Sequence, residues 1–206
     1  MRKLILVLSA VAGMTACSSQ APTPAPAEKP QPKPAELVTG RAGLQKSYIA
    51  ARGWAPDAKP FRVESQTSAD SKGAKGLSAV WRSSFASDSR HGVKPYVWSG
   101  STAADAPSRG INPGLEDSYN PGNSSTQVFD FVFLKIDSDK ALEIAEKHGG
   151  DKIVVKNPDI SIFYLLDWNR GNNELVWHVI YGNTRDDAKL RVAVNASTGE
   201  FLRVEK

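Results

Sequence analysis

The sequence predicts an α+β fold made of two units, each a helix followed by an antiparallel meander of strands, which share one core. Apolar residues at helical spacing open each half, over 37–135 and 136–206, and alternating apolar residues follow them. Gly- and Asn-rich turns separate the alternating runs. Residues 37–206 are enough for one domain or for two small packed units.

Residues 1–16 are typical of an export signal. Arg2 and Lys3 precede an apolar run over 4–12, which is shorter than the roughly 20 residues that a membrane-spanning helix needs. The following Met-Thr-Ala-Cys at 14–17 resembles the lipobox of bacterial lipoproteins, although Met14 stands where that family prefers Leu. The resemblance implies cleavage before Cys17 and acylation of its sulfur, with palmitate or similar chains holding the protein on a membrane.

Two other interpretations of this region stay open. Cys17 could be incidental in an ordinary secretory signal cut after Ala12 or Ala16, or the apolar run could be an uncleaved anchor, which its short length disfavours. Cys17 is the only cysteine, so the exported part has no partner for an internal disulfide. By resemblance to Gram-negative lipoproteins, Ser18 implies sorting to the outer membrane, facing the periplasm.

Residues 17–36 are rich in Pro and Ala, with little to bury, and predict a disordered, partly extended tether. A ligand for a Pro-binding partner is the alternative. Without Arg2 and Lys3 the basic residues fall from 26 to 24, against 22 acidic residues. This balance, with no basic cluster, gives no reason to expect a nucleic-acid partner.

The first half, 37–135, opens with a helix that Thr39 caps and that ends near Gly53. Alternation predicts strands over 61–67, 79–85 and 93–98. Residues 99–126 are rich in Ser, Gly, Pro, Asn and Asp and predict a long surface loop, of the kind that is often functional or disordered. Residues 127–135 are apolar at successive positions, which predicts a buried strand joining the two units.

The second half, 136–206, is the clearer one. Asp137 and Ser138 cap a helix over 139–148, which Gly149 and Gly150 end. A turn is expected at 167–169. Four strands follow the helix, over 160–166, 175–181, 190–194 and 200–204, and a tight hairpin at 196–199 joins the last two.

The halves share local sequence. Trp81 to Ser87 aligns with Trp177 to Asn183, and a Pro-Asp pair precedes the first strand of each half, at 56–57 and 158–159. An internal duplication and chance similarity both remain open.

Residues 190–202 resemble the C-terminal hairpin of PepSY domains, whose D-A-x-T-G turn has Asp where Asn195 stands here. The helix after 139, the strand at Trp177 and this hairpin follow the order of that family, over about 70 residues. The resemblance implies PepSY- or cystatin-like units without catalytic activity, which bind or restrain peptidases or other partners in the bacterial envelope.

No motif predicts a catalytic residue, a metal site or a cofactor. His91, His148 and His178 lack metal-ligand spacing, and no nucleophile elbow, P-loop or dinucleotide fingerprint is present. His148 suits a helix end, and His178 suits cross-strand packing. If His178 and Asp167 met in an open cleft, a hydrolase would become the better hypothesis.

The function expected is that of a membrane-anchored envelope lipoprotein that binds a protein or peptide without catalysis. It would present a sheet face or the 99–126 loop, and Trp98, Arg109 and Tyr119, on or beside that loop, are the candidate contacts. A structural accessory subunit of an envelope assembly and a hydrolase with an unrecognised site are the alternatives.

Overall fold

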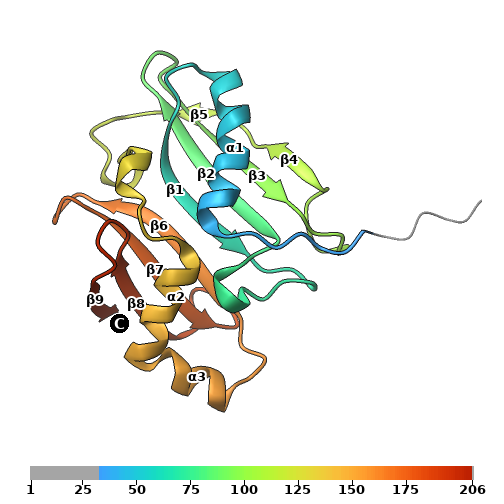
Figure 1. Cartoon of the computed structure of the whole chain (residues 1–206). Helices are drawn as coiled ribbons and strands as arrows, with labels where there is room; N and C mark the ends of the chain where they lie inside the picture. The colour runs from blue at the N-terminus through green and yellow to red at the C-terminus, as the bar shows by residue number, and fades with distance from the viewer. Residues whose placement is uncertain (1–32, 206) are drawn as a thin grey trace, which may run out of the picture. The chain divides into compact units, whose positions relative to one another are not determined.

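One antiparallel sheet of nine strands carries the structure, a computed structural model that describes residues 33–205 (Figure 1). The strands lie in the order β4-β3-β2-β1-β6-β7-β8-β9, and β5 pairs with β3 beside β4. Their bounds are β1 Lys59–Gln66, β2 Val80–Ser87, β3 Gly92–Ser99, β4 Gly110–Pro113, β5 Asp117–Ser118, β6 Ile162–Asn169, β7 Glu174–Gly182, β8 Ala188–Asn195 and β9 Phe201–Glu205. The predictions for Cys17 and for the segments at 1–16 and 17–32 lie outside the described residues.

The helices pack on one face of this sheet and leave the other face open (Figure 1). Helix α1 (Gly40–Trp54) lies over β2 and β3, and α2 (Ser138–Ala145) lies over β7 and β8. A turn over Glu146–Gly150 links α2 to α3 (Asp151–Lys156). The prediction of an α+β class is confirmed. None of the helices within 33–205 is long and apolar enough to cross a membrane.

A single strand pair joins the two halves of the sheet. β1 and β6 run antiparallel, with Val63 opposite Leu166, so that one continuous sheet forms. Beneath the helices the indoles of Trp81 and Trp177 lie edge to face, with ring centroids 6.4 Å apart. Both are fully buried. The core therefore runs unbroken across the strand pair.

The two tryptophans make corresponding hydrogen bonds. The indole N–H of Trp81 donates to the Val38 carbonyl at 3.0 Å, and that of Trp177 donates to the Ile136 carbonyl at 2.9 Å. Each carbonyl lies two residues before the first residue of a helix. Each bond thus satisfies a buried indole donor and fixes the point at which a helix begins.

The two helix N-termini also contact each other. The buried Ser138 hydroxyl accepts from the Gly40 amide at 2.9 Å and donates to the Gly76 carbonyl at 2.6 Å. The Asp137 carboxylate accepts from the Arg41 amide at 2.9 Å and also caps its own helix. Side chains of the second half therefore satisfy free amides of α1, whose predicted cap Thr39 makes no side-chain bond.

The prediction of a buried strand over 127–135 is wrong. Residues Phe131–Phe133 form a 3₁₀ turn, in which Val132 and Phe133 are exposed while the flanking Phe129 and Leu134 are buried. The backbone bonds of the segment are divided, since Phe129 donates to Pro60 and Lys135 donates to Ala196. An apolar run without strict alternation does not separate a strand from an anchored turn.

The helix predicted over 139–148 ends earlier than expected and resumes as α3, which the sequence pattern did not predict. Gly149 has a φ of 111°, a conformation that glycine adopts without a Cβ clash. A Cβ on Gly150 would lie 2.1 Å from the Tyr181 hydroxyl oxygen. The two glycines therefore bend the helical segment against β7 instead of ending it.

Two further expectations need correction. Asp167 and Trp168 lie inside β6, and the expected turn begins only at Asn169, whose side chain accepts from the Gly171 amide at 3.0 Å. The segment 99–126 is more than a surface loop, because it contains β4 and β5, both paired with β3. These strands have four and two residues, too few for alternation to reveal.

Candidate binding groove

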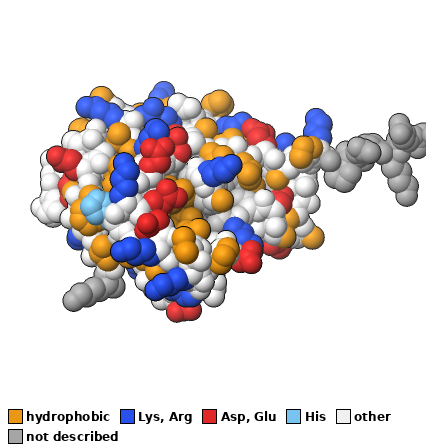
Figure 2. Space-filling model, turned by 60° about the horizontal axis from the view of Figure 1, so that its bottom comes forward, with side chains coloured by type: hydrophobic (Ala, Val, Ile, Leu, Met, Phe, Trp, Pro, Cys, Tyr) orange, Lys and Arg blue, Asp and Glu red, His pale blue; other side chains and the backbone are white. Residues whose placement is uncertain are grey.

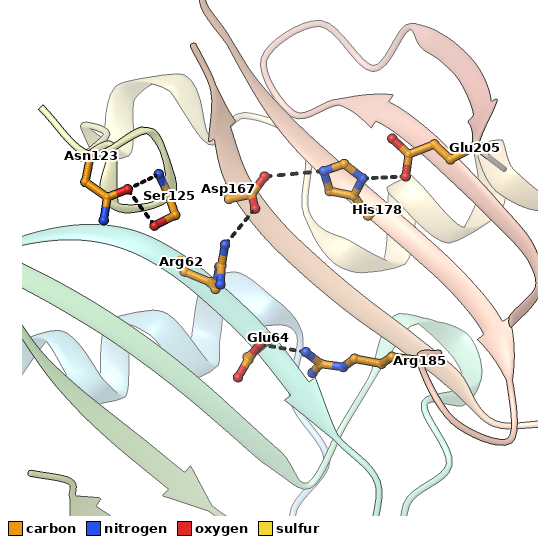
Figure 3. Close-up of polar contacts among 8 residues, drawn as sticks. All are labelled: Arg62, Glu64, Asn123, Ser125, Asp167, His178, Arg185 and Glu205. Carbon is orange, nitrogen blue, oxygen red and sulfur yellow. Dashed lines mark hydrogen bonds and ion pairs between the residues drawn. The ribbon is translucent and has the colours of Figure 1, made fainter. Parts of the chain in front are cut away.

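Strand alternation places charged side chains on the open face of the sheet, opposite the helices. Figure 2 views the molecule from below the view of Figure 1, and it shows basic and acidic side chains interspersed with apolar ones there. In the close-up of Figure 3, Arg62, Asp167, His178 and Glu205 follow one another across the strands, and Glu64 meets Arg185 beside them.

His178 lies between two carboxylates on this face. Its Nε2 is 3.3 Å from Asp167 Oδ1, and its Nδ1 is 2.8 Å from Glu205 Oε2 (Figure 3). Burial by itself lowers the pKa of His178, but the hydrogen bonds and charges of the two carboxylates outweigh it and raise the pKa to about 9. The pKa of Asp167 is lowered: burial opposes ionisation, and the contacts with His178 and Arg62 overcome it.

The cluster is a row of ion pairs that runs from Arg62 through Asp167 and His178 to Glu205. At neutral pH the His178 ring is doubly protonated and both nitrogens face carboxylates, so the ring has no lone pair with which to accept a proton. His178 and Asp167 do meet, but the histidine side chain is only 16% exposed and does not stand in an open cleft. Within 33–205, no group of three or more His, Cys, Asp or Glu side chains is arranged to hold a metal ion.

A groove crosses the same face over β2 and β3, formed by three adjoining hollows of about 370, 390 and 410 Å³. Arg82, Pro95 and Leu115 line both the 410 Å³ hollow and the 390 Å³ hollow. Pro107 lines both the 390 Å³ hollow and the 370 Å³ hollow. We call this set of hollows the binding groove. Its lining residues are Phe61, Glu64, Ser65, Gln66, Thr67, Val80, Arg82, Ser84, Val93, Lys94, Pro95, Val97, Asp105, Pro107, Asn112, Pro113, Gly114, Leu115, Glu116, Asp117, Phe163 and Arg185.

The outer wall of the binding groove comes from residues 105–117 and is tied down at several points. The Asp105 carboxylate accepts twice from the Ala69 amide, at 3.0 and 3.2 Å, and the Gly114 amide donates to the Pro95 carbonyl at 2.8 Å. Leu115 stands on the rim and is 91% exposed. The wall is therefore a fixed element that presents an unburied aliphatic side chain.

Arg82 lies in the middle of the binding groove with its charge poorly matched. Its side chain is 44% exposed, and its one ion pair among the described residues is a long contact of 3.9 Å from Nε to Glu64 Oε1. That carboxylate is already bonded to Arg185 at 2.6 Å. Within residues 33–205 the guanidinium of Arg82 makes no hydrogen bond.

The three residues singled out from the sequence do not come together. Trp98 is buried on the helix side of β3, beneath the Lys46 ammonium. Arg109 holds the segment before α1, through Glu36 at 3.6 Å and the Pro34 carbonyl at 3.1 Å. Tyr119 lies at the other end of β3, where its amide donates to the His91 carbonyl and where burial raises the pKa of its phenol.

The remaining histidines have local roles. His91 lies in the β2–β3 turn with a φ of 51°, and His148 stacks on Phe201 with ring centroids 3.7 Å apart. Arg82 was not predicted as a site residue, although its alternation with Trp81 along the strand places it on the open face, and the apolar wall at Pro107 and Leu115 was not predicted either.

The resemblances to lipoproteins and to PepSY domains rest on the residues of the sequence alone. In comparisons with protein-family models, with curated proteins and with solved structures, nothing matches this chain.

Proposed function

We propose that this chain is a lipid-anchored protein of the bacterial cell envelope whose folded part binds an extended segment of a protein or peptide, without catalysis, in the binding groove. The observation that carries the proposal is the groove itself, three adjoining hollows along β2 and β3 with a fixed wall. Ligand sites are concave and largely preformed, with apolar surface and a few placed polar groups.

The lining favours a peptide over a small polar metabolite. Val93, Val97 and Pro113 give apolar surface, and Pro95 and Pro107 stiffen it. Leu115 on the rim has almost all of its surface left to bury, and each Å² of apolar area removed from water contributes about 25 cal/mol. An extended chain lying along the groove would cover this side chain and meet the few polar groups beneath it.

Attachment to the envelope is the second part of the proposal. The segments at 1–16 and 17–36 support it, with Cys17 as the acylated residue and with the periplasmic side of the outer membrane as the location. Cells fed radiolabelled palmitate should label the wild type and a Ser18→Ala control but leave Cys17→Ala unlabelled. Equal labelling of the Cys17→Ala variant would contradict lipid attachment at this residue.

We also infer that the two halves are PepSY- or cystatin-like units related by duplication. Each half has a helix followed by antiparallel strands, and their first strands, β1 and β6, lie side by side in opposite directions, as a two-fold relation requires. The matching indole-to-carbonyl bonds of Trp81 and Trp177 support the same relation, because chance similarity of sequence would not reproduce a buried contact.

Site-specific photocrosslinking in cells tests the groove as the binding surface. A benzoylphenylalanine at position 115 should give a saturable crosslink to one envelope protein, mapped to an extended segment and competed by a synthetic peptide of that segment. The matched control is position 49, since Ile49 on α1 is 79% exposed and belongs to the helical layer. Identical crosslink patterns from both positions would contradict the proposal.

A further inference from the structure

Arg82 divides the binding groove into two stretches whose surface is mainly apolar, although Lys94, Glu116 and Asp117 also line the first of them. On one side the groove continues past Ser84 and Val93, and on the other it continues past Val97 and Pro113. Because the hollows extend in both directions from this side chain, a chain lying in the groove runs past Arg82 and does not end at it.

The acidic groups around the binding groove are already occupied. Glu64 binds Arg185, whose Nη2 also donates to the Ser65 carbonyl at 2.6 Å. Glu116 accepts from the Trp54 indole at 2.8 Å and contacts Arg90 Nε at 3.3 Å. The carboxylate of Asp117, at one end, accepts from the Ser118 amide at 2.7 Å.

Arg82 differs in this respect from a comparable arginine on the same sheet face. Arg203 is also 44% exposed, but it donates to Glu205 at 2.7 Å. A guanidinium offers five N–H donors in a planar fork that matches a carboxylate with two parallel bonds. Arg82 thus keeps, in the middle of the binding groove, the hydrogen-bond donors that Arg203 has already used.

We propose that the binding groove selects extended peptides in which one acidic side chain stands between apolar residues, and that Arg82 binds that carboxylate. This inference rests on the function proposed above and adds the chemistry of the ligand. The apolar stretches on both sides of Arg82 receive the flanking residues, and the guanidinium sets the register of the peptide. An internal Asp or Glu fits this geometry better than a terminal carboxylate, because the groove continues beyond Arg82.

A phage-displayed library of random heptapeptides, fused so that their C-termini are not free, tests the inference on the full chain. Selection on the wild type should enrich peptides with Asp or Glu at one aligned position between apolar residues. A blocked synthetic peptide from that pool should bind Arg82→Gln about tenfold more weakly than the wild type, since one charge-assisted contact is lost. Replacing the Asp or Glu of this peptide by Asn or Gln should weaken its binding to the wild type by the same factor. The same replacement should not weaken its binding to Arg82→Gln any further.

Matched variants separate the possible failures. Arg203→Gln removes an equally exposed arginine outside the binding groove and should bind as the wild type does, and Arg82→Lys should recover part of the affinity. If the selected peptides need Leu115, shown by loss of binding in Leu115→Asp, but have no acidic position, the inference about Arg82 is overturned and the groove still stands. If a free terminal carboxylate replaces the acidic side chain without loss, the internal acid is overturned. If neither Leu115→Asp nor Arg82→Gln changes the affinity for the selected peptides, the proposed function is contradicted as well.

Discussion

Replacing His178 by Gln should change how the stability of the fold depends on pH. The folded state raises the pKa of this imidazole from about 6.5 to about 9, so the folded protein holds the ring proton more tightly than the unfolded chain does. That difference is about 3 kcal/mol of favourable interaction with the charged ring. It contributes fully below pH 6.5 and is lost as the pH rises through about 9.

The expected result follows from this sign. Between pH 6 and pH 9.5 the wild-type free energy of unfolding should fall by about 3 kcal/mol more than that of His178→Gln, so that the two curves converge at high pH. The lowered pKa values of Asp167 and Glu205 act in the opposite direction, because their contribution is present above their ordinary pKa values and is lost on acidification. The window from pH 6 to pH 9.5 therefore isolates the histidine.

Urea denaturation followed by tryptophan fluorescence at half-unit pH intervals gives the two curves. Ser125→Ala is the control and should keep the wild-type slope, since this exposed side chain carries no charge and lies outside the row of ion pairs. NMR of the imidazole nitrogens should show the doubly protonated ring of His178 at pH 7, and Glu205→Gln should lower the pKa toward 6.5. Parallel stability curves for the wild type and His178→Gln, or a neutral ring at pH 7, would refute the reasoning.

Substitutions at two positions in the core should lower the stability of the fold, and each has a matched control. Gly43→Ala should destabilise the fold by about 1–3 kcal/mol, because the new Cβ would lie 2.5 Å from Trp81, whereas Gly53→Ala in the same helix has no atom within 4 Å and should stabilise it by up to about 1 kcal/mol. Thermal melts of the two variants should move in opposite directions. Ser138→Ala should cost about 1–3 kcal/mol, since it leaves a buried amide and carbonyl without their bridge, while the exposed Ser125→Ala should stay within about 0.5 kcal/mol in urea titrations. A Ser138→Ala protein as stable as Ser125→Ala would mean that the link between the helices does not hold them.

Local periodicity was sufficient to predict most elements. The helix after Thr39 and the strands of both meanders lie close to their expected places. Each of these elements has its own pattern of apolar residues, which depends only on the residues of that segment. The segment at 127–135 failed for the opposite reason, since its conformation depends on bonds to Pro60 and Ala196 in other parts of the chain. The pairing of β1 with β6 is also non-local, and no sequence pattern within either strand predicts it.

The candidate site shows the same division. Polar, Pro-rich composition marked 99–126 as a functional segment, and the wall of the binding groove does lie within it. Arg82 could not be identified from the sequence as a binding residue. Its N–H donors stay free because Glu64 binds Arg185, which lies 121 residues after Glu64 in the chain. Trp98 illustrates the reverse error, because a tryptophan beside a loop looked exposed, and strand register turned it towards the helices.

The pairing of β1 with β6 has a consequence for folding. The contact between Ser65 and Tyr164 across this strand pair joins residues 99 apart, and contacts between such distant residues form slowly. Until they form, the outer hydrogen-bonding groups of β1 are open, and an open strand edge pairs with whatever strand it meets. A second copy of the chain presents the same edge, and an antiparallel pairing of β1 with a second β1 would imitate the finished sheet. Refolding at high protein concentration should therefore favour dimers linked through β1, and refolding at high dilution should favour monomers.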